Sequence, residues 1–216
     1  MNHIKQMFAL QQKLNDETNG TIWTEGATKE GRQIFWLRCV YMEAVEAIDS
    51  FNWKHWKNIE GEHDLDNVKV ELVDIWHFIM SESIHFGDKQ FAEAYEDNPA
   101  GKEVNPALMI EILEKMVAVA SSANVDKSIN ALYDITGLFF RALSAMCMDV
   151  PELYKRYLVK NQLNTFRQNN GYKEGNYQKI WGIVEDNVIA FNLMDENPDL
   201  TPEGLYEKLE EVYKKC

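Results

Sequence analysis

Two pairs of acidic residues, each spaced three apart, stand inside apolar stretches of this sequence. Glu43 and Glu46 lie in RCVYMEAVEAID, and Glu71 and Asp74 lie in VKVELVDIWHFIM. Residues three apart are neighbours on one face of an α-helix, so each pair presents two carboxylates from one spot. If the two helices pack side by side in opposite directions, four carboxylates converge. Oxygen ligands without thiolates suit a hard cation such as Mg²⁺ or Mn²⁺, which indicates a metal-dependent enzyme acting on phosphates.

A solvated helix face is the alternative interpretation, because most glutamates on helices are surface residues. Three observations favour a site. Trp36, Cys39 and Met42 share the face of Glu43 and Glu46, so that face is apolar and we expect it to be covered. The second pair also has apolar neighbours, and the two pairs occupy successive helices joined by a short connection. Four clustered carboxylates without cations would repel one another, and bound metal removes that repulsion.

An iron site is a further possibility, because ferritin-like bundles bind two irons through Glu-x-x-His motifs on two different helices. Glu82 with His85 is a literal match, and Asp74 with His77 is a variant. Both fall on the same predicted helix, so they cannot supply opposite sides of a di-iron site. We therefore expect oxygen-only ligation and Mg²⁺.

The composition limits the class of protein. The chain has 216 residues, of which 45% are hydrophobic, and its formal net charge is −13. This size allows a substantial core, and we expect a single domain over residues 1–216. The acidic balance argues against nucleic-acid binding, which needs basic surface. A small phosphate ligand stays possible, because metals supply positive charge locally.

Cysteine usage and hydropathy predict a cytoplasmic protein. Cys39, Cys147 and Cys216 are far apart and form no CxxC motif, which fits a reducing compartment and no structural zinc. The first residues, MNHIKQMFALQQKLND, lack the apolar region of a signal peptide. No uncharged apolar run reaches the roughly 18 residues that cross a membrane.

Apolar periodicity predicts an all-α helical bundle. The predicted helices cover 3–17, 31–57, 66–86, 106–123, 128–148, 151–168, 184–196 and 202–215. In the helix 31–57 the core stripe consists of Leu37, Val40, Tyr41, Ala44, Val45 and Ile48. The connections are 18–32, 58–67, 87–105 with a short helix, and 169–182. No window alternates as a β-strand does.

Two further groups of residues have chemistry that a nucleotide site would use. Trp53 and Trp56 flank basic residues in WKHWK, where they could stack on a base or simply pack at a helix end. Lys160, Asn164 and Arg167 follow the i, i+4, i+7 spacing of one helical face. A basic face in an acidic protein suggests a phosphate contact, although a solvated face gives the same pattern.

Several blocks of the sequence closely resemble the dimeric dUTPases of the all-α NTP pyrophosphatase superfamily. They are LQQKLNDETNG (10–20), EGRQIFWLRCVYMEAVEAIDSFNWKHWKNI (30–59), ELVDIWH (71–77) and KNQLNTFRQNNGYKEG (160–175). The resemblance spans about 10–187, and the segment 87–150 contains no motif of the family. The paired acids alone are typical of the whole superfamily, whereas SFNWKHWK and RQNNGYK are more specific.

The resemblance implies a homodimer that hydrolyses dUTP, and also dUDP, to dUMP with two or three Mg²⁺ ions, with Mn²⁺ as a substitute. It implies four metal ligands, Glu43, Glu46, Glu71 and Asp74. It places His77 near the deoxyribose and base, and Gln11 and Asn15 in the substrate pocket. Asn164 would read the uracil edge through its amide. The phosphate-facing residues would be Lys160, Arg167, Tyr172, Lys173 and Lys179.

Pyrophosphate hydrolysis needs charge neutralisation, an in-line water and a group that accepts the proton of that water. We expect Glu43 to be this base, with Glu46 as the rival. The nearest alternative function is a related NTP pyrophosphatase with another base preference, such as dCTP. A catalytically idle helical dimerisation module is a different class of alternative, and the four intact acidic positions argue against it.

Overall fold

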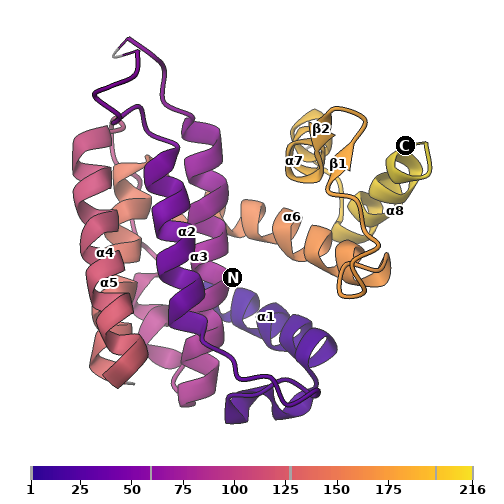
Figure 1. Ribbon diagram of the computed structural model, residues 1–216, viewed down its shortest axis with the longest axis horizontal. Helices are drawn as coiled ribbons and strands as arrows, with labels where there is room; N and C mark the ends of the chain where they lie inside the picture. The colour runs from indigo at the N-terminus through magenta and orange to yellow at the C-terminus, as the bar shows by residue number, and fades with distance from the viewer. Residues whose placement is uncertain (1, 59, 127, 198, 216) are drawn as a thin grey trace. The chain divides into compact units, whose positions relative to one another are not determined.

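The computed structural model describes residues 2–58, 60–126, 128–197 and 199–215. Helices dominate these residues, which confirms the predicted all-α class (Figure 1). The chain divides into two compact units, Met1–Leu153 and Tyr154–Cys216.

The first unit is a bundle of four helices with a fifth helix packed against it. The four are α2 (Trp36–Asp49), α3 (Leu65–Phe86), α4 (Pro106–Asp126) and α5 (Ile129–Ala145). Helix α2 packs against α3 and α4, and α5 packs against α3 and α4, so the four lie side by side (Figure 1). Helix α1 (His3–Asn19) packs against α3. Helix α3 therefore contacts α1, α2 and α5.

Aromatic packing fixes α3 in the first unit. The fully buried ring of Trp76 stacks on Phe139 of α5, with centroids 5.0 Å apart. It also meets Phe140 at 5.3 Å and Phe8 of α1 at 6.0 Å, both edge to face. Each such pair adds about 0.5–1.5 kcal/mol to the effect of burial. Because Trp76 holds one face of α3, the polar residues on its other faces have fixed positions.

The ends of α3 follow from local chemistry. Asp64 caps the start of the helix, because its side chain accepts a hydrogen bond from the backbone N–H of Asn67 at 3.0 Å. Gly87 ends the helix with φ 75°, a left-handed conformation that costs glycine little. The observed bounds agree with the predicted helix 66–86.

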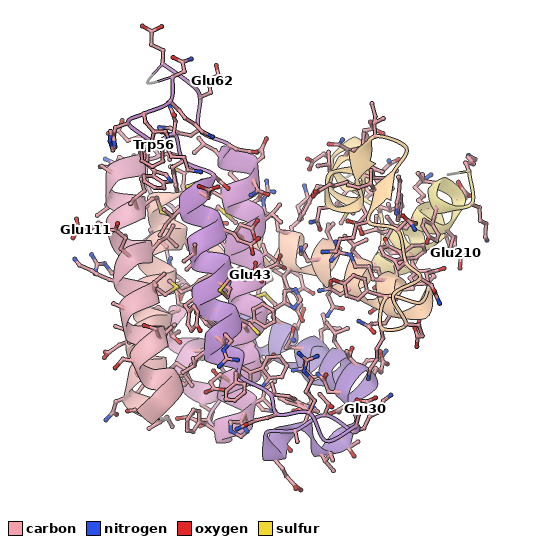
Figure 2. All side chains as sticks on the ribbon, in the orientation of Figure 1. Glu30, Glu43, Trp56, Glu62, Glu111 and Glu210 are labelled. Carbon is pink, nitrogen blue, oxygen red and sulfur yellow. The ribbon has the colours of Figure 1, made fainter. Side chains whose placement is uncertain are left out.

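The predicted helix 31–57 is too long at both ends, because α2 covers only Trp36–Asp49. Before it, Ala27 and Gln33 form an isolated antiparallel bridge. After it, the Nδ2 of Asn52 donates to the backbone oxygens of Asn58 at 3.0 Å and Gly61 at 2.8 Å. These bonds fold the chain into a loop, residues 50–64, that extends beyond the end of the bundle (Figure 2).

The predicted core stripe of α2 is also partly wrong. Leu37, Val40 and Ala44 are buried, but Val45 is 45% exposed. Met42, which was expected to lie on a covered face, is 47% exposed. Helix α2 therefore buries a narrower stripe than its apolar composition suggests.

The second unit is built on α6 (Val150–Asn169), most of whose residues belong to it. It continues with β1 (Ile180–Trp181), β2 (Val184–Glu185), α7 (Asp186–Glu196) and α8 (Pro202–Tyr213). Its core contains Val159, Leu163, Phe166, Tyr177, Trp181, Ala190, Met194, Leu205 and Leu209. The two strands pair antiparallel, with Ile180 opposite Glu185. The expectation of no strand is wrong, because two-residue strands are too short to leave an alternating pattern.

The predicted bounds of the other helices agree with the observed bounds to within a few residues. Short 3₁₀ helices occur at Thr21–Glu25 and Gln90–Tyr95, the second within the connection where a short helix was predicted. Cys39 and Cys147 are free thiols, while Cys216 lies outside the described residues. Within the described ranges, no single helix is long and apolar enough to span a membrane. Helices α5 and α6 meet these two criteria only when they are taken together, and the pair is bent.

Candidate functional site

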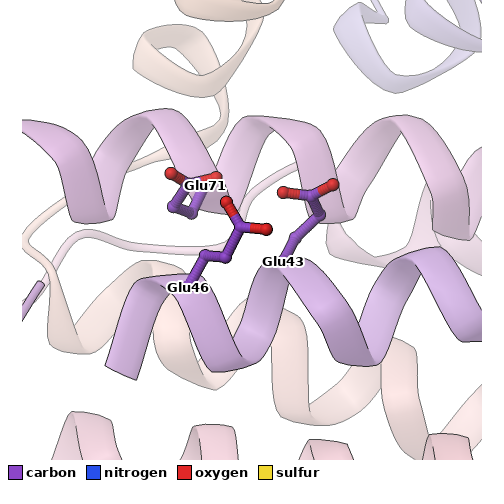
Figure 3. Close-up of side chains that lie close together, drawn as sticks. All are labelled: Glu43, Glu46 and Glu71. Atoms are coloured by element: carbon purple, nitrogen blue, oxygen red, sulfur yellow. The ribbon is translucent and has the colours of Figure 1, made fainter. Parts of the chain in front are cut away.

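Three of the four predicted acidic ligands meet between α2 and α3. Glu43 and Glu46 project from α2 toward Glu71 of α3 (Figure 3). One carboxylate oxygen from each lies within 4.8 Å of the others. Glu71 is buried, Glu43 is half-buried and Glu46 is exposed, so the group opens to solvent on the Glu46 side. A divalent cation could take one oxygen from each residue.

Electrostatics brings the fourth predicted ligand into the same group. The pKa of Glu43 is raised to about 8, by burial first and then by the charges of Asp74, Glu71 and Glu46 in that order of effect. A hydrogen bond with Glu71 acts in the same direction. Without cations Glu43 therefore keeps a proton at neutral pH. A bound cation would reverse this, because positive charge favours the ionised carboxylate.

Asn67 holds the buried acid Glu71 in place, a role that no sequence motif indicates. Its Nδ2 donates to Oε1 of Glu71 at 3.0 Å and to Oγ of Ser50 at 2.8 Å. Asn67 stands one turn before Glu71 on α3, so a single amide links the acidic cluster to the end of α2. The i, i+4 spacing of an amide and a carboxylate was the available signal.

A cavity of about 490 Å³ adjoins the acidic cluster. Its lining includes Glu46 and Glu71 together with Lys54 and Lys57 from the loop 50–64. Lys54 forms an ion pair with Asp49, which holds the pKa of that carboxyl below its usual range. Acidic and basic groups thus face one cavity, an arrangement that suits a metal–phosphate ligand.

Trp53 and Trp56 lie in the loop 50–64, so the interpretation of packing at a helix end is wrong. Their side chains are 44% and 63% exposed, and their rings meet edge to face at 5.6 Å. Lys54 Nζ lies 5.6 Å from the centre of the Trp53 ring. Exposed indole rings beside lysines are available to stack on a base.

A buried polar network joins α1 to α3 and contains three predicted substrate residues. Gln11 Nε2 donates to Asn15 Oδ1 at 3.2 Å and to Ser81 Oγ at 3.1 Å, and Asn15 Nδ2 donates to the same Ser81 oxygen at 2.9 Å. Gln11 Oε1 accepts from His77 Nδ1 at 2.6 Å. Ser81 was not anticipated, although its position four residues after His77 places both on one helical face.

The second unit gathers Lys160, Asn164 and Arg167, as their helical spacing predicts. Arg167 donates from Nε and Nη2 to the two carboxylate oxygens of Asp186, both at 2.8 Å. Its Nη1 donates to Asn164 Oδ1 at 3.3 Å. Lys160 Nζ donates to Asn187 Oδ1 at 3.1 Å. The basic face is thus hydrogen-bonded to α7 and is not simply solvated.

The other three predicted phosphate-facing residues are exposed. Tyr172 and Lys173 lie in the turn that follows α6, and Lys179 precedes β1. The ring of Tyr172 is approached by Arg167, whose Cζ lies 5.9 Å from its centre, and by Lys179 Nζ at 5.6 Å. Two cations therefore meet at one aromatic ring.

Asp186, Asn187 and Tyr177 take part in this arrangement and were not anticipated. Tyr177 O–H donates to Asp186 Oδ2 at 2.8 Å. Burial raises the pKa of Tyr177 and the bond to Asp186 raises it further, so the phenol stays protonated. The sequence offered one indication of this role, because Asp186 lies near the start of the predicted helix 184–196. An acidic residue at that position usually indicates only a favourable interaction with the helix dipole.

Glu82 and His85, the literal Glu-x-x-His pair, line a separate cavity of about 140 Å³ together with Trp36 and residues of the segment 25–37. His85 Nδ1 donates to the backbone oxygen of Thr24 at 2.7 Å. The pair therefore lies on a different part of α3 from the acidic cluster.

Comparison with known families agrees with this geometry. A family model described as dUTPase matches residues 3–172, a segment that contains the acidic cluster, the polar network of α1 and α3, and Lys160 to Tyr172. No curated protein matches the sequence. The match covers well over half of the chain. The chain therefore belongs to the dUTPase family, the enzymes that hydrolyse dUTP.

Proposed function

We propose that this dUTPase is a Mg²⁺-dependent dUTP diphosphatase that converts dUTP and dUDP to dUMP, releasing pyrophosphate or phosphate. The observation that carries the proposal is the acidic cluster of Glu43, Glu46 and Glu71 beside a cavity with two lysines. We also propose that residues 1–216 act as one dUTPase-like domain, because the family match runs from the first compact unit into the second.

The donor set fits a hard cation. Glu43, Glu46, Glu71 and Asp74 would hold two or three Mg²⁺ ions through carboxylate oxygens alone, with Mn²⁺ as a substitute. The raised pKa of Glu43 supports this fit, because a cluster that retains a proton when empty is one that cations stabilise. Mg²⁺, when bound, supplies charge neutralisation for the phosphates and lowers the pKa of a coordinated water.

Glu43 is our candidate for the group that accepts the proton of the attacking water, with Glu46 as the rival. Glu43 is half-buried and in contact with the other acids, whereas Glu46 is exposed. The resemblance to the dimeric dUTPases implies that water attacks the β-phosphorus, and we expect the same here. A base buried beside other carboxylates is tuned by its neighbours, which is how enzymes match a pKa to the working pH.

Recognition of the nucleoside is proposed for the polar network and the exposed indoles. Gln11 and Asn15 would be polar groups of the substrate pocket, and His77 would lie near the deoxyribose and base. Their mutual hydrogen bonds keep these side chains in fixed rotamers. Trp53 and Trp56 would stack on the base. The Asn164 amide would read O4 and N3–H of uracil.

We propose that basic residues bind the phosphates. In the first unit Lys54 and Lys57 line the cavity beside the acidic cluster. In the second unit we assign Lys160, Arg167, Tyr172, Lys173 and Lys179 to this role. Arginine favours it because its fork matches phosphate oxygens, while each lysine acts as a point charge.

We further propose a cytoplasmic homodimer that needs neither nucleic acid nor membrane. Exposed apolar side chains on the neighbouring helices α2 and α4, namely Met42, Val45 and Leu108, support a second copy of the chain as a partner. The net charge of −13 supports the absence of nucleic acid. In the cell the enzyme would limit uracil incorporation into DNA and supply dUMP.

The deciding experiment measures the release of dUMP and pyrophosphate from dUTP with Mg²⁺, with dUDP, dCTP, dTTP and UTP in parallel. The native protein is compared with Glu46→Gln and with Glu111→Gln, a control that changes an exposed acid paired with Lys115 on α4. We expect selective turnover of dUTP and dUDP that EDTA and Glu46→Gln abolish and Glu111→Gln leaves intact.

Each other outcome has a definite meaning. Preference for dCTP would keep the fold and move the base assignment. Full activity in EDTA would refute metal dependence. Full activity of Glu46→Gln would refute the acidic cluster as the site, and no turnover of any nucleotide would favour an idle helical scaffold.

A further inference from the structure

Asp186 is an acidic side chain buried to 1% exposure at the first residue of α7. Its Oδ1 accepts from Arg167 Nη2 and from the backbone N–H of Asn187, both at 2.8 Å. Its Oδ2 accepts from Arg167 Nε and from Tyr177 O–H, also at 2.8 Å. Four donors, two of them from a guanidinium, therefore converge on one carboxylate.

The carboxylate is held in its ionised form. Burial works to raise the pKa of Asp186, but the hydrogen bonds and charge of Arg167, with the bonds from Tyr177 and Asn187, lower it overall. A buried arginine fork on an ionised carboxylate is a rigid, bidentate pair. The plane of the Arg167 guanidinium is consequently fixed by α7.

The same turn of α7 reaches the other basic residue of this face. Asn187 Oδ1 accepts from Arg167 Nη2 at 3.2 Å and from Lys160 Nζ at 3.1 Å. Lys160 is itself 2% exposed, so its ammonium group is held at this position by packing as well. Asp186 and Asn187 thus hold two cations, which lie about two helical turns apart along α6, in a single hydrogen-bonded network.

We propose that Asp186 is a positioning residue for phosphate binding, which orients Arg167 directly and Lys160 through Asn187. The inference rests on the proposed function, because that assigns Arg167 and Lys160 to the phosphates. A cation whose rotamer is already fixed loses less conformational freedom when it binds an anion. The anchor lies beyond residue 172, where the family match ends, so it is supplied by a segment that the match does not cover.

A purely structural role makes a different prediction. If the ion pair only attaches α7 to α6, its loss lowers stability, because it leaves a buried guanidinium without its partner. The folded fraction would then bind substrate normally. If Asp186 orients the cations, the folded variant binds dUTP more weakly, and this shows as a raised KM with a smaller change in kcat.

The test measures kcat and KM for dUTP at saturating Mg²⁺, together with Tm, for Asp186→Asn, Arg167→Ala and the double variant. We expect each single variant to raise KM about tenfold, and the double variant to raise it no further than Arg167→Ala does. The matched control is Tyr206→Phe. It removes the hydroxyl that accepts a bond from Asn169 on α6 at 2.9 Å, and so it weakens the helix packing without touching the cations.

Two further variants keep the test decisive if Asp186→Asn does not fold. Asn187→Ala keeps both bonds between Arg167 and Asp186 and removes the oxygen that accepts from Lys160 and from Arg167 Nη2. We therefore expect a smaller rise in KM, which is reduced further in a Lys160→Ala background. Asp186→Glu retains the charge, so its KM for dUTP should lie between that of the native protein and that of Asp186→Asn.

The possible failures are distinguishable. An unchanged KM in Asp186→Asn and in Asn187→Ala, with a raised KM in Arg167→Ala, would overturn the positioning role while leaving the phosphate assignment intact. An unchanged KM in Arg167→Ala would overturn the phosphate assignment and the inference with it. An equal rise in KM for Tyr206→Phe would show a general packing effect and would also overturn the inference.

Discussion

Asn67 Nδ2 lies 3.0 Å from Oε1 of Glu71, one helical turn further along α3. The same nitrogen lies 2.8 Å from Ser50 Oγ at the end of α2. One amide therefore fixes the rotamer of the buried acid and ties it to the helix that carries Glu43 and Glu46. Groups that orient a metal ligand in this way affect affinity without touching the metal.

Replacing Asn67 with alanine should weaken Mg²⁺ activation. Without the amide, Glu71 must be oriented by the metal itself, so we expect the Mg²⁺ concentration for half-maximal activity to rise about 10–100-fold. Activity at saturating Mg²⁺ should largely recover. The control is Asp66→Asn, an exposed neighbour on α3 that pairs with Lys69. Equal Mg²⁺ requirements in native protein and Asn67→Ala would show that Glu71 needs no such support.

The metal-free protein should lose stability as the pH rises. The pKa of Glu43 is about 8 in the folded chain and about 4.3 for an unfolded glutamate. Between these two pKa values the folded state binds more protons than the unfolded state. The stabilisation from Glu43 is therefore fully present below the unfolded pKa and is lost as the pH rises to the folded pKa, by at most about 1.4 kcal/mol per pH unit. In EDTA we expect Tm to decrease from about pH 5 to pH 8.

Glu43→Gln should flatten this dependence, because the amide has no proton to lose. Addition of Mg²⁺ to the native protein should raise Tm most at the upper end of the range, where the empty cluster is most strained by repulsion. A Tm that rises steadily with pH in EDTA would contradict the assignment, as would a profile that Glu43→Gln leaves unaltered.

Ser81→Ala should impair discrimination between nucleotides. Ser81 Oγ accepts from Gln11 and Asn15 and donates to the backbone oxygen of His77. Its loss removes the oxygen that accepts from the buried Asn15 amide and one of the two acceptors of the Gln11 amide, which costs about 1–3 kcal/mol of stability. We also expect the ratio of kcat/KM for dUTP to that for dTTP and dCTP to fall.

Ser83→Ala is the matched control for this prediction. Ser83 is equally buried on the same helix, and its hydroxyl donates to the backbone oxygen of Ile79 at 2.8 Å. It lies outside the Gln11–Asn15–His77 network. The same loss of discrimination in both serine variants would mean that a disturbed α3, and not the network, sets the preference.

Lys57→Ala should weaken binding of the triphosphate. Lys57 lines the cavity beside Glu46 and Glu71, where its charge would offset that of the phosphates. We expect KM for dUTP to rise several-fold, more at low ionic strength than at high, because salt screens exposed charges. Lys13→Ala, which removes an exposed lysine of α1, is the control. If both variants shift KM alike, the effect is one of net charge only.

The two acidic pairs could be predicted from the sequence because each pair depends on the geometry of a single helix. Spacing of three within apolar stretches placed Glu43 beside Glu46 and Glu71 beside Asp74, and a short connection made α2 and α3 neighbours. The same spacing gathered Lys160, Asn164 and Arg167. Features that follow from the period of one helix require no knowledge of the fold.

Other features depend on contacts that no local pattern records. The end of α2 is set by the side chain of Asn52, which bonds to carbonyls six and nine residues away, so periodicity carried the predicted helix too far and placed Trp53 and Trp56 on it. The partner of Arg167 is Asp186, nineteen residues away and in another helix. Nothing in the spacing of either residue indicates that pair.

The loop 50–64 returns close to its starting point, because the backbone N–H of Asp64 donates to the oxygen of Ser50 at 2.9 Å. Its two stems are therefore joined independently of the residues between them. Insertions or deletions at the tip of the loop should leave the carboxylates where they are. One residue added within α2 between Glu43 and the loop would instead rotate Glu43 by about 100° relative to α3 and separate the cluster. The loop can therefore be lengthened without moving the acidic cluster, whereas a change in the length of α2 near Glu43 would disrupt it.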